Sequence, residues 1–274
     1  MIRLSNQTGT GLLVLPSLWA LVLASNGIPN PTLLVVFILG AFLLRSGGVV
    51  VNDLADRSID RQVRRTKNRP LASGILTPYQ AIFILFIFLL PAAGLLWFLN
   101  PLATRLCSVA VLLIMAYPFA KRVLPFPQLV LGLAFGWGAV IAWAAVRNTL
   151  EVSTWYVYGA TICWAMAYDT IYAIQDKEDD RRIGIQSSAI ALGDQCWIGV
   201  GIFSGLMLAL LGTAGWLRQL AWPFYAVLVA VGWILGSQAF ELRENISPTR
   251  SFELFKQHTW IGTGILLGIF LGTL

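Results

Sequence analysis

Acidic side chains concentrate in two short segments of this sequence. Eight of its thirteen Asp and Glu residues lie in them, namely Asp53, Asp56, Asp60, Asp169, Asp176, Glu178, Asp179 and Asp180. Within segment 52–60, Asn52, Asp56 and Asp60 follow one another at intervals of four residues. That spacing places side chains on one face of a helix. The segment therefore predicts a row of oxygen ligands.

The second acidic segment, 169–180, has the same character. Asp169 and Asp176 are seven residues apart, about two helical turns, and Asp180 follows one turn later. Carboxylates one turn apart repel each other on a bare helix, so both rows require a cation. Magnesium suits them, because it takes one or two carboxylates, several waters and phosphate oxygens. Two such rows predict a magnesium-bridged diphosphate; the alternative is that neighbouring arginines neutralise them in solvent.

Basic residues near the acidic segments fit an anionic ligand of this kind. Three of them come directly after the first segment, and a Tyr and a Lys one helical turn apart occur further along the chain. The candidates for contact with a diphosphate are Arg65, Lys67, Arg69, Tyr117 and Lys121. For Arg57, Arg61 and Arg122 we expect a role in membrane orientation and contact with lipid headgroups instead.

Arg45 differs from these residues because it lies inside an apolar run, two helical turns before Asn52. A charged side chain within the hydrocarbon is costly, and its presence there indicates a partner and a function. A guanidinium group can hold a carboxylate through two parallel hydrogen bonds. We therefore expect Arg45 to bind an acid below the row that begins at Asn52, with extension of its side chain to the membrane interface as the alternative.

The elements that carry these residues are predicted from composition. Of the 274 residues, 57% are hydrophobic and only 12% are charged, and the mean hydropathy is +0.74. In soluble domains about a quarter of the residues are charged, so a soluble globular fold is excluded. Apolar runs near the ~20 residues needed to cross a bilayer recur along the chain, and such runs must be helical.

We predict an all-α, polytopic membrane protein, one domain over residues 1–274 that forms a bundle of nine transmembrane helices. The expected spans are 10–26, 31–51, 79–99, 101–118, 128–146, 154–174, 197–215, 220–239 and 258–274. With the N-terminus in the cytoplasm and the C-terminus outside, 15 of the 19 Lys and Arg residues fall on the cytoplasmic side. Both acidic segments then lie at the cytoplasmic face.

The remaining reactive side chains offer little chemistry. The three cysteines, Cys107, Cys163 and Cys196, form no metal-ligand spacing and are interpreted as packing residues. The single histidine, His258, opens the last apolar run, where we expect an interfacial polar residue. The net charge of +6 is attributed to membrane orientation, so no nucleic acid is expected as a partner.

Longer motifs surround these residues. They read NDxxDxxxD at 52–60, RTxNRPLxSG at 65–74 and YDTxYAxxD at 168–176. In order and spacing they resemble the intramembrane prenyltransferases of the UbiA superfamily, and within it the 4-hydroxybenzoate polyprenyltransferases. The segments AYPxxKR at 116–122 and EDDRRIG at 178–184 resemble the cyanobacterial branch, described as 4-hydroxybenzoate solanesyltransferases of plastoquinone biosynthesis. The chain departs from many relatives at 5–8, so no substrate role is assigned there.

The resemblance implies an Mg²⁺-dependent enzyme that joins a polyprenyl diphosphate to a small aromatic acid in a bacterial plasma membrane or thylakoid, with no obligatory protein partner. It implies that Arg45 holds the carboxylate of the acceptor and that Tyr117 and Lys121 face the diphosphate. Asp169 is our candidate for the base, with the released diphosphate as the alternative. The residues that hold magnesium and its diphosphate would be Asn52, Asp53, Asp56, Asp60, Asp169, Asp176 and Asp180.

Three alternative functions stay open from the sequence. The first is a relative with another acceptor, such as homogentisate, naphthoate, a chlorophyllide or haem. The second is a secondary transporter, which intramembrane charge also suits, although the acidic rows lie at one face rather than at the midplane. The third is a membrane scaffold, which has little need for rows of metal-type ligands.

Overall fold

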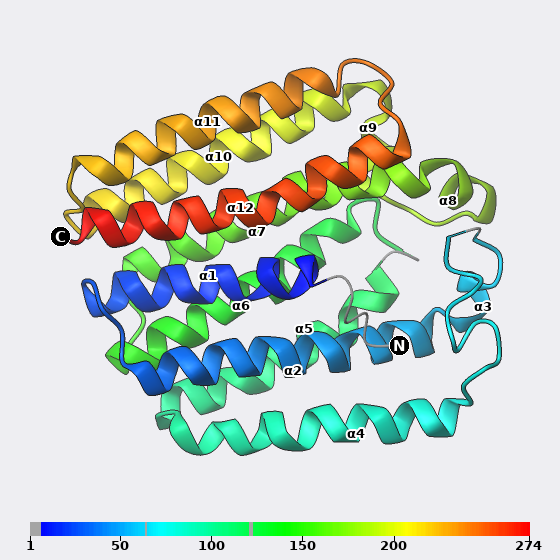
Figure 1. Cartoon of the computed structure of the whole chain (residues 1–274), viewed down its shortest axis with the longest axis horizontal. Helices are drawn as coiled ribbons and strands as arrows, with labels where there is room; N and C mark the ends of the chain where they lie inside the picture. The colour runs from blue at the N-terminus through cyan, green and yellow to red at the C-terminus, as the bar shows by residue number, and fades with distance from the viewer. Residues whose placement is uncertain (1–6, 64, 121–122) are drawn as a thin grey trace.

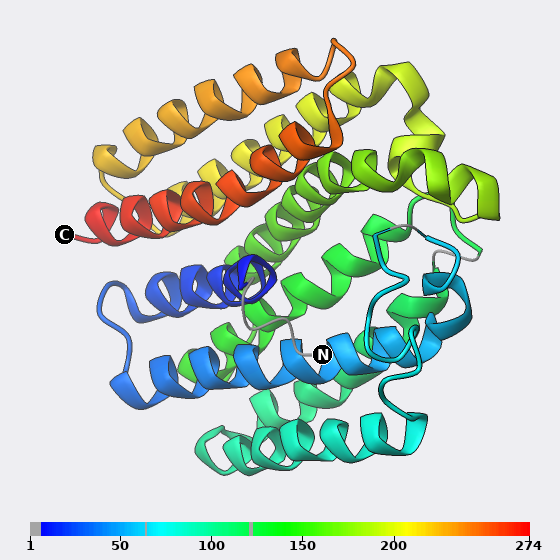
Figure 2. The same ribbon diagram turned by 45° about the vertical axis from the view of Figure 1, so that its right-hand side comes forward.

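The computed structural model describes residues 7–63, 65–120 and 123–274, and no β-strand occurs in these residues. Helices of 17 or more residues form the bundle, and they lie roughly parallel or antiparallel to one another (Figures 1 and 2). They are α1 (Thr8–Ser25), α2 (Pro31–Ala55), α4 (Pro78–Gly94), α5 (Pro101–Ala120), α6 (Pro127–Arg147), α7 (Val152–Ala173), α10 (Cys196–Leu217), α11 (Trp222–Glu241) and α12 (Pro248–Gly272).

Each of these long helices overlaps one of the expected spans, and the all-α prediction is confirmed for the residues that the structure describes. Within the described ranges, seven helical segments are long and apolar enough to cross a membrane, and α7 and α12 are the two long helices outside that set. Both pack among other helices, α7 against α6, α10 and α12. An interior helix meets less lipid and tolerates more polar residues, so nine crossings stay a prediction.

The last helix begins earlier than its apolar run. We expected a span from 258, whereas α12 starts at Pro248. Its first turns carry charged and amide side chains, so hydropathy alone misses them. The start is set instead by Ser247, whose side chain accepts a hydrogen bond from the Arg250 backbone N–H, with Pro248 at the first helical position.

Other helix starts follow the same local rules. The Asn30 side chain accepts from the Thr32 N–H at the start of α2, and Pro31 follows it. Thr77 and Gln80 form a reciprocal capping box at the start of α4. These local signals fix where α2 and α4 begin.

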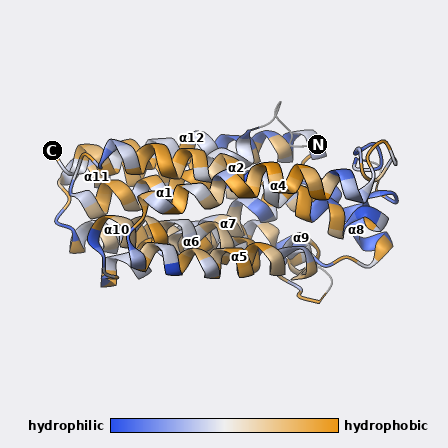
Figure 3. Ribbon diagram, turned by 90° about the horizontal axis from the view of Figure 1, so that it is seen from below, coloured by the Kyte–Doolittle hydropathy of each residue, from blue (hydrophilic) through white to orange (hydrophobic). Residues whose placement is uncertain are grey.

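One end of the bundle is polar and carries the short elements. Figure 3 shows blue, hydrophilic residues around α8 at this end, whereas orange, apolar residues predominate along the long helices. In Figure 1 the same end holds α3 and α8, and the C-terminus lies at the opposite end. The short elements are α3 (Arg57–Asp60), 3-10 helix η2 (Ile174–Asp176), α8 (Lys177–Ile183), α9 (Ser188–Leu192) and 3-10 helix η3 (Gly193–Gln195).

Buried tryptophans hold α1, α7 and α12 together. The Trp19 indole N–H donates to the Gly262 carbonyl at 2.9 Å, and its ring lies 4.9 Å from that of Trp164. The Trp164 indole N–H donates to His258 Nδ1 at 2.9 Å. The expectation that His258 is an interfacial residue is wrong: its side chain is 0% exposed. Because α12 begins ten residues before the expected span, position 258 lies inside the bundle.

Gly262 tests this packing, because a Cβ atom there would lie 2.5 Å from a Trp164 ring carbon. We expect Gly262→Ala to lower the unfolding free energy by about 1–3 kcal/mol, the usual cost of overpacking. The measurement is thermal unfolding in detergent, followed by tryptophan fluorescence. Gly264→Ala on the same helix is the control, because no atom lies within 4 Å of its Cβ position. Equal melting temperatures for the two variants would contradict this account.

Candidate active site

A cavity of about 660 Å³ extends from the polar end into the bundle, and both acidic rows line it. Helices α2, α5, α6 and α7 contribute walls, together with the start of α1 and the segment after α3. The predicted ligands that line the cavity are Asn52, Asp56, Asp60, Asp169, Asp176 and Asp180. Residues 117 positions apart in the sequence thus share one site, as the matching rows predicted.

The side chains of the first row, Asn52, Asp56 and Asp60, stay aligned although the helix that carries them is interrupted. Helix α2 ends at Ala55, and Asp56 lies between α2 and α3 with φ −94° and ψ 5°. The Asp56 N–H still donates to the Asn52 carbonyl at 2.9 Å, and the Asp60 N–H donates to the Asp56 carbonyl at 2.8 Å. The chain therefore keeps a near-helical path, and all three side chains stay on the cavity side.

Arg69 joins two acidic residues of the first motif. Its Nη1 lies 3.1 Å from Asp53 Oδ1 and 2.7 Å from Asp60 Oδ2. Asp53 is 2% exposed and is absent from the cavity lining. The structure thus places Asp53 behind the cavity wall and against Arg69, which itself lines the cavity.

Arg65 connects the two motifs across the site. Its Nε donates to Asp176 Oδ1 at 2.9 Å, and its Nη2 pairs with Asp176 Oδ2. The guanidinium carbon also lies 5.5 Å from the centroid of the Tyr172 ring. Burial lowers the pKa of Arg65, whereas the hydrogen bond to Asp176 raises it, and the resulting pKa is above the ordinary value. A predicted substrate-binding residue and a predicted metal ligand therefore form an ion pair here.

Two arginines assigned to lipid headgroups hold the segment after α3 instead. Arg57 Nε donates to the Leu71 carbonyl at 3.3 Å, and Arg61 Nε donates to the Ala72 carbonyl at 2.9 Å. The Thr66 hydroxyl donates to the Asp60 carbonyl at 3.0 Å. These bonds close the loop back on the first motif and so position Arg65 and Arg69. The headgroup interpretation missed this because carbonyl partners leave no signal in the sequence.

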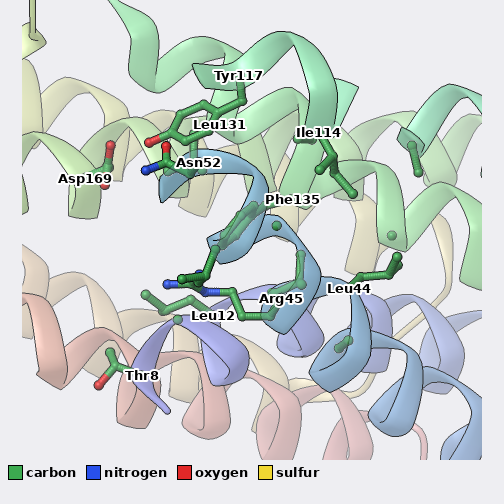
Figure 4. A pocket seen from close by; sticks show the side chains of 18 of the residues that line it. Thr8, Leu12, Leu44, Arg45, Asn52, Ile114, Tyr117, Leu131, Phe135 and Asp169 are labelled. Carbon is green, nitrogen blue, oxygen red and sulfur yellow. The ribbon is translucent and has the colours of Figure 1, made fainter. Parts of the chain in front are cut away.

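Arg45 lies deeper in the cavity than the acidic rows. Figure 4 shows its guanidinium group near Phe135 and Leu12, with Asn52, Tyr117 and Asp169 further up the same pocket. A Cβ atom on Gly9 would lie 2.6 Å from Arg45 Nε, so α1 packs closely on the guanidinium group. The expectation that Arg45 faces the same interior as Asn52 is confirmed by this lining.

Other predicted residues are placed as follows. Tyr117 lines the cavity from the last turn of α5, beside Asn52 in Figure 4. Lys67 is exposed and is absent from the cavity lining. Lys121 and Arg122 lie outside the described residues. Cys107 also lines the apolar part of the cavity, and all three cysteines are free.

The oxygen donors that line the cavity are suited to magnesium rather than to a metal held entirely by protein ligands. Among the described residues, no three His, Cys, Asp or Glu side chains converge closely enough to hold an ion by themselves. Magnesium does not need such a cage, because it keeps waters and binds substrate phosphates alongside one or two carboxylates. Amide and carboxylate oxygens on two walls of one cavity fit that requirement.

Away from the acidic rows the cavity becomes apolar. Its deeper walls come from α2, α4, α5 and the 3-10 helix η1 (Leu95–Phe98), with Leu89, Leu96 and Ile114 among the lining residues. One site therefore offers carboxylates and arginines at one end and hydrocarbon at the other. It suits a ligand with a charged head and a long apolar tail.

The sequence did not locate the aromatic wall of the cavity. Tyr168 and Tyr172 of α7 face Phe252 and Phe255 of α12 there, with the Tyr172 and Phe255 ring centroids 4.7 Å apart. The four-residue spacing of the tyrosines, one helical turn, is a signal that was available. The phenylalanines were hidden because α12 was expected to start after them.

Comparison with known proteins identifies the family to which a chain with this site belongs. A model of the UbiA prenyltransferase family matches residues 13–261. The chain belongs to the UbiA prenyltransferase family. It is 43% identical over 275 residues to a 4-hydroxybenzoate octaprenyltransferase of Hydrogenovibrio crunogenus, covering 100% of this chain and 96% of that protein. It is 42% identical over 278 residues to a 4-hydroxybenzoate solanesyltransferase of Synechocystis sp., with 100% and 94% covered.

Solved UbiA homologues share the fold. One from Aeropyrum pernix, in its apo form, superposes with a TM-score of 0.78 at 24% identity and covers 94% of this chain and 97% of its own. One from Archaeoglobus fulgidus, bound to GPP and Mg²⁺, has a TM-score of 0.68 at 14% identity, with 95% and 96% covered. The likeness to the UbiA fold thus extends over at least 94% of this chain.

Arg69 gives a stability test of the site. We expect Arg69→Gln to lower the unfolding free energy by about 3–5 kcal/mol, because it withdraws a cation from two buried carboxylates. Thermal unfolding in detergent measures this, with Lys67→Gln as an exposed control that changes stability by less than about 0.5 kcal/mol. If both variants melted with the wild type, the ion pairs of Arg69 would not support the loop.

Proposed function

We propose that this protein transfers a long polyprenyl group from polyprenyl diphosphate to 4-hydroxybenzoate, at the ring carbon ortho to the hydroxyl. The observation that carries this proposal is a single cavity with acidic rows and arginines at one end and apolar walls at the other. The names of relatives at 43% and 42% identity support the acceptor. The product would enter prenylquinone biosynthesis.

The proposed roles follow from position. Asn52, Asp56 and Asp60 on one wall and Asp176 and Asp180 on the other would hold Mg²⁺. Bound magnesium would supply positive charge that stabilises the departing diphosphate. Homologous structures bound to GPP or DMAPP with Mg²⁺ support a divalent metal here.

Cationic and phenolic groups would complete the diphosphate site. Arg65 and Arg69 line the cavity beside the rows, and Tyr117 faces it from α5. Lys67 and Lys121 stay sequence-based candidates for the same anion. Asp53 would act through Arg69, which it contacts at 3.1 Å.

The chemistry breaks the C–O bond between the allylic carbon and the diphosphate. The electron pair leaves with the diphosphate, and a delocalised carbocation remains. The acceptor ring, activated by its hydroxyl, attacks this carbon and forms a C–C bond. The ring proton then passes to Asp169, which lines the cavity, or to the released diphosphate. Arg45 would hold the acceptor carboxylate during these steps.

The tail explains why the site lies in a membrane protein. Each methylene-sized group loses about 0.8 kcal/mol on leaving lipid, so a polyprenyl chain stays in the bilayer. Relatives named for octaprenyl and solanesyl transfer are almost equally similar, and we propose solanesyl from the sequence motifs. The acidic end would face the cytoplasm, with the N-terminus inside and the C-terminus outside.

A transfer assay tests the proposal. Membranes containing the protein receive radiolabelled 4-hydroxybenzoate and solanesyl diphosphate, with Mg²⁺ or with EDTA. We expect label in the lipid-extractable product only with Mg²⁺, because the acidic rows cannot hold the diphosphate without a cation. No transfer by folded protein would remove this acceptor from the proposal while leaving the family in place.

A matched pair of variants tests the first acidic row. Asp56→Asn keeps the shape of a side chain that lines the cavity but removes its charge, and we expect turnover to fall by about 100-fold or more. Glu178→Gln is the control, because Glu178 is exposed and lies outside the cavity lining. Full activity of Asp56→Asn, in protein with wild-type melting behaviour, would show that the row is not used.

A further inference from the structure

Tyr168 is the residue before Asp169 on α7, and it lines the cavity with a side chain that is 1% exposed. Its ring meets the Trp164 ring edge-on at 5.3 Å and the Phe255 ring at 6.0 Å. His258 lies 5.8 Å away on a third side and is fixed by its hydrogen bond from Trp164. The phenol is therefore held in one orientation.

The Tyr168 hydroxyl is buried and has no hydrogen-bond partner among the residues that the structure describes. Buried hydroxyl groups are almost always paired, because they can both donate and accept, and each unpaired one needs an explanation. Nothing in the packing requires a hydroxyl here, since the aromatic contacts would be the same for a Phe. A rigid, unpaired donor in the wall of a ligand cavity indicates a polar ligand atom.

The neighbours of Tyr168 restrict what that atom can be. Asp169, Tyr117 and Arg45 line the same cavity as Tyr168. The apolar tail of a prenyl donor offers no acceptor to a hydroxyl, and its diphosphate oxygens are assigned above to Mg²⁺, Arg65, Arg69 and Tyr117. A carboxylate held by Arg45 does offer an acceptor, because the guanidinium fork occupies two of its roughly four lone-pair positions.

We propose that the Tyr168 hydroxyl donates a hydrogen bond to the carboxylate of the aromatic acceptor, alongside Arg45. This inference rests on the proposed function, which supplies the acid. Tyr168 is then a specificity residue: a buried donor left unpaired penalises acceptors that lack a carboxylate. Arg45 provides charge, and Tyr168 provides a second direction that fixes the tilt of the ring.

The test is equilibrium binding to the purified protein without prenyl diphosphate, so that it does not depend on turnover. Radiolabelled 4-hydroxybenzoate is the probe, and unlabelled benzoate, which lacks the ring hydroxyl, competes with it. The variants are Tyr168→Phe, Arg45→Gln and the control Tyr158→Phe. Tyr158 lies on the same helix, its hydroxyl donates to the Leu133 carbonyl, and it is outside the cavity lining.

We expect Tyr168→Phe to weaken 4-hydroxybenzoate and benzoate by the same factor, about 10- to 100-fold, as for a hydrogen bond to a charged group. Tyr158→Phe should bind both acids like the wild type. The melting temperatures of all variants should differ little from that of the wild type. Unchanged affinity in Tyr168→Phe would overturn the inference and leave the proposed function intact.

Two further outcomes are decisive. Weaker binding of 4-hydroxybenzoate with unchanged binding of benzoate would place Tyr168 at the ring hydroxyl and so overturn the carboxylate assignment. Wild-type protein that binds no 4-hydroxybenzoate would overturn the proposed function itself, and the inference with it. Arg45→Gln separates these cases, because it weakens both acids only if the carboxylate lies where we place it.

Discussion

Like-charged carboxylates at one end of an apolar bundle repel each other. The arginines around the site, and the hydrogen bonds that position them, offset that repulsion. The carboxylates cannot spread apart, because both rows continue from long helices whose positions are set by packing deeper in the bundle. Nor can they simply be solvated, since Asp53 and Asp56 are 2% and 1% exposed. Buried charge of this kind is tolerated only beside compensating cations.

The loop that carries the compensating arginines, Arg65 and Arg69, is held in place by other arginines that donate to its backbone carbonyl groups. Arg57 and Arg61 donate to carbonyl groups of residues 71 and 72, which folds the segment after α3 back over the first motif. Only in that conformation can Arg69 reach two carboxylates and Arg65 reach Asp176 on the other motif. The site is therefore assembled by a loop on a rigid helical frame, and the loop's own hydrogen bonds determine where its charges lie.

The frame could be predicted from sequence because it depends on local rules. Apolar runs and the spacing of side chains on one helix face each depend on a short stretch of sequence, and they located the long helices and the two rows. The start of α12 could not be found in this way, since its first turns are polar and the helix is stabilised by Ser247 and by packing. The buried place of His258 was missed for the same reason.

The ion pairs within the site could not be predicted from the sequence, for a different reason. Arg65 and Asp176 are 111 residues apart, and no spacing rule connects them. The sequence indicated that both belong near an anion, but only the fold shows that they contact each other. Likewise, Tyr168 belonged to a recognised motif, yet only the fold shows that its buried hydroxyl has no hydrogen-bond partner in the part of the chain that the structure describes.

The gradient along the cavity explains why these features coexist in one chain. In a ligand with a diphosphate head and a polyprenyl tail, the head is most stable in water and the tail is most stable in lipid. Transfer of the tail into water costs free energy in proportion to its size, and transfer of the head into lipid costs free energy because of its charge. A bundle that is apolar along its length and acidic at one end gives each part its own environment. Arg45 lies below the rows (Figure 4), and Tyr168 lines the same cavity next to Asp169. The depth of Arg45 in the cavity, rather than its identity alone, is what would bring the carboxylate of a small aromatic acid, and with it the ring, to the reacting carbon.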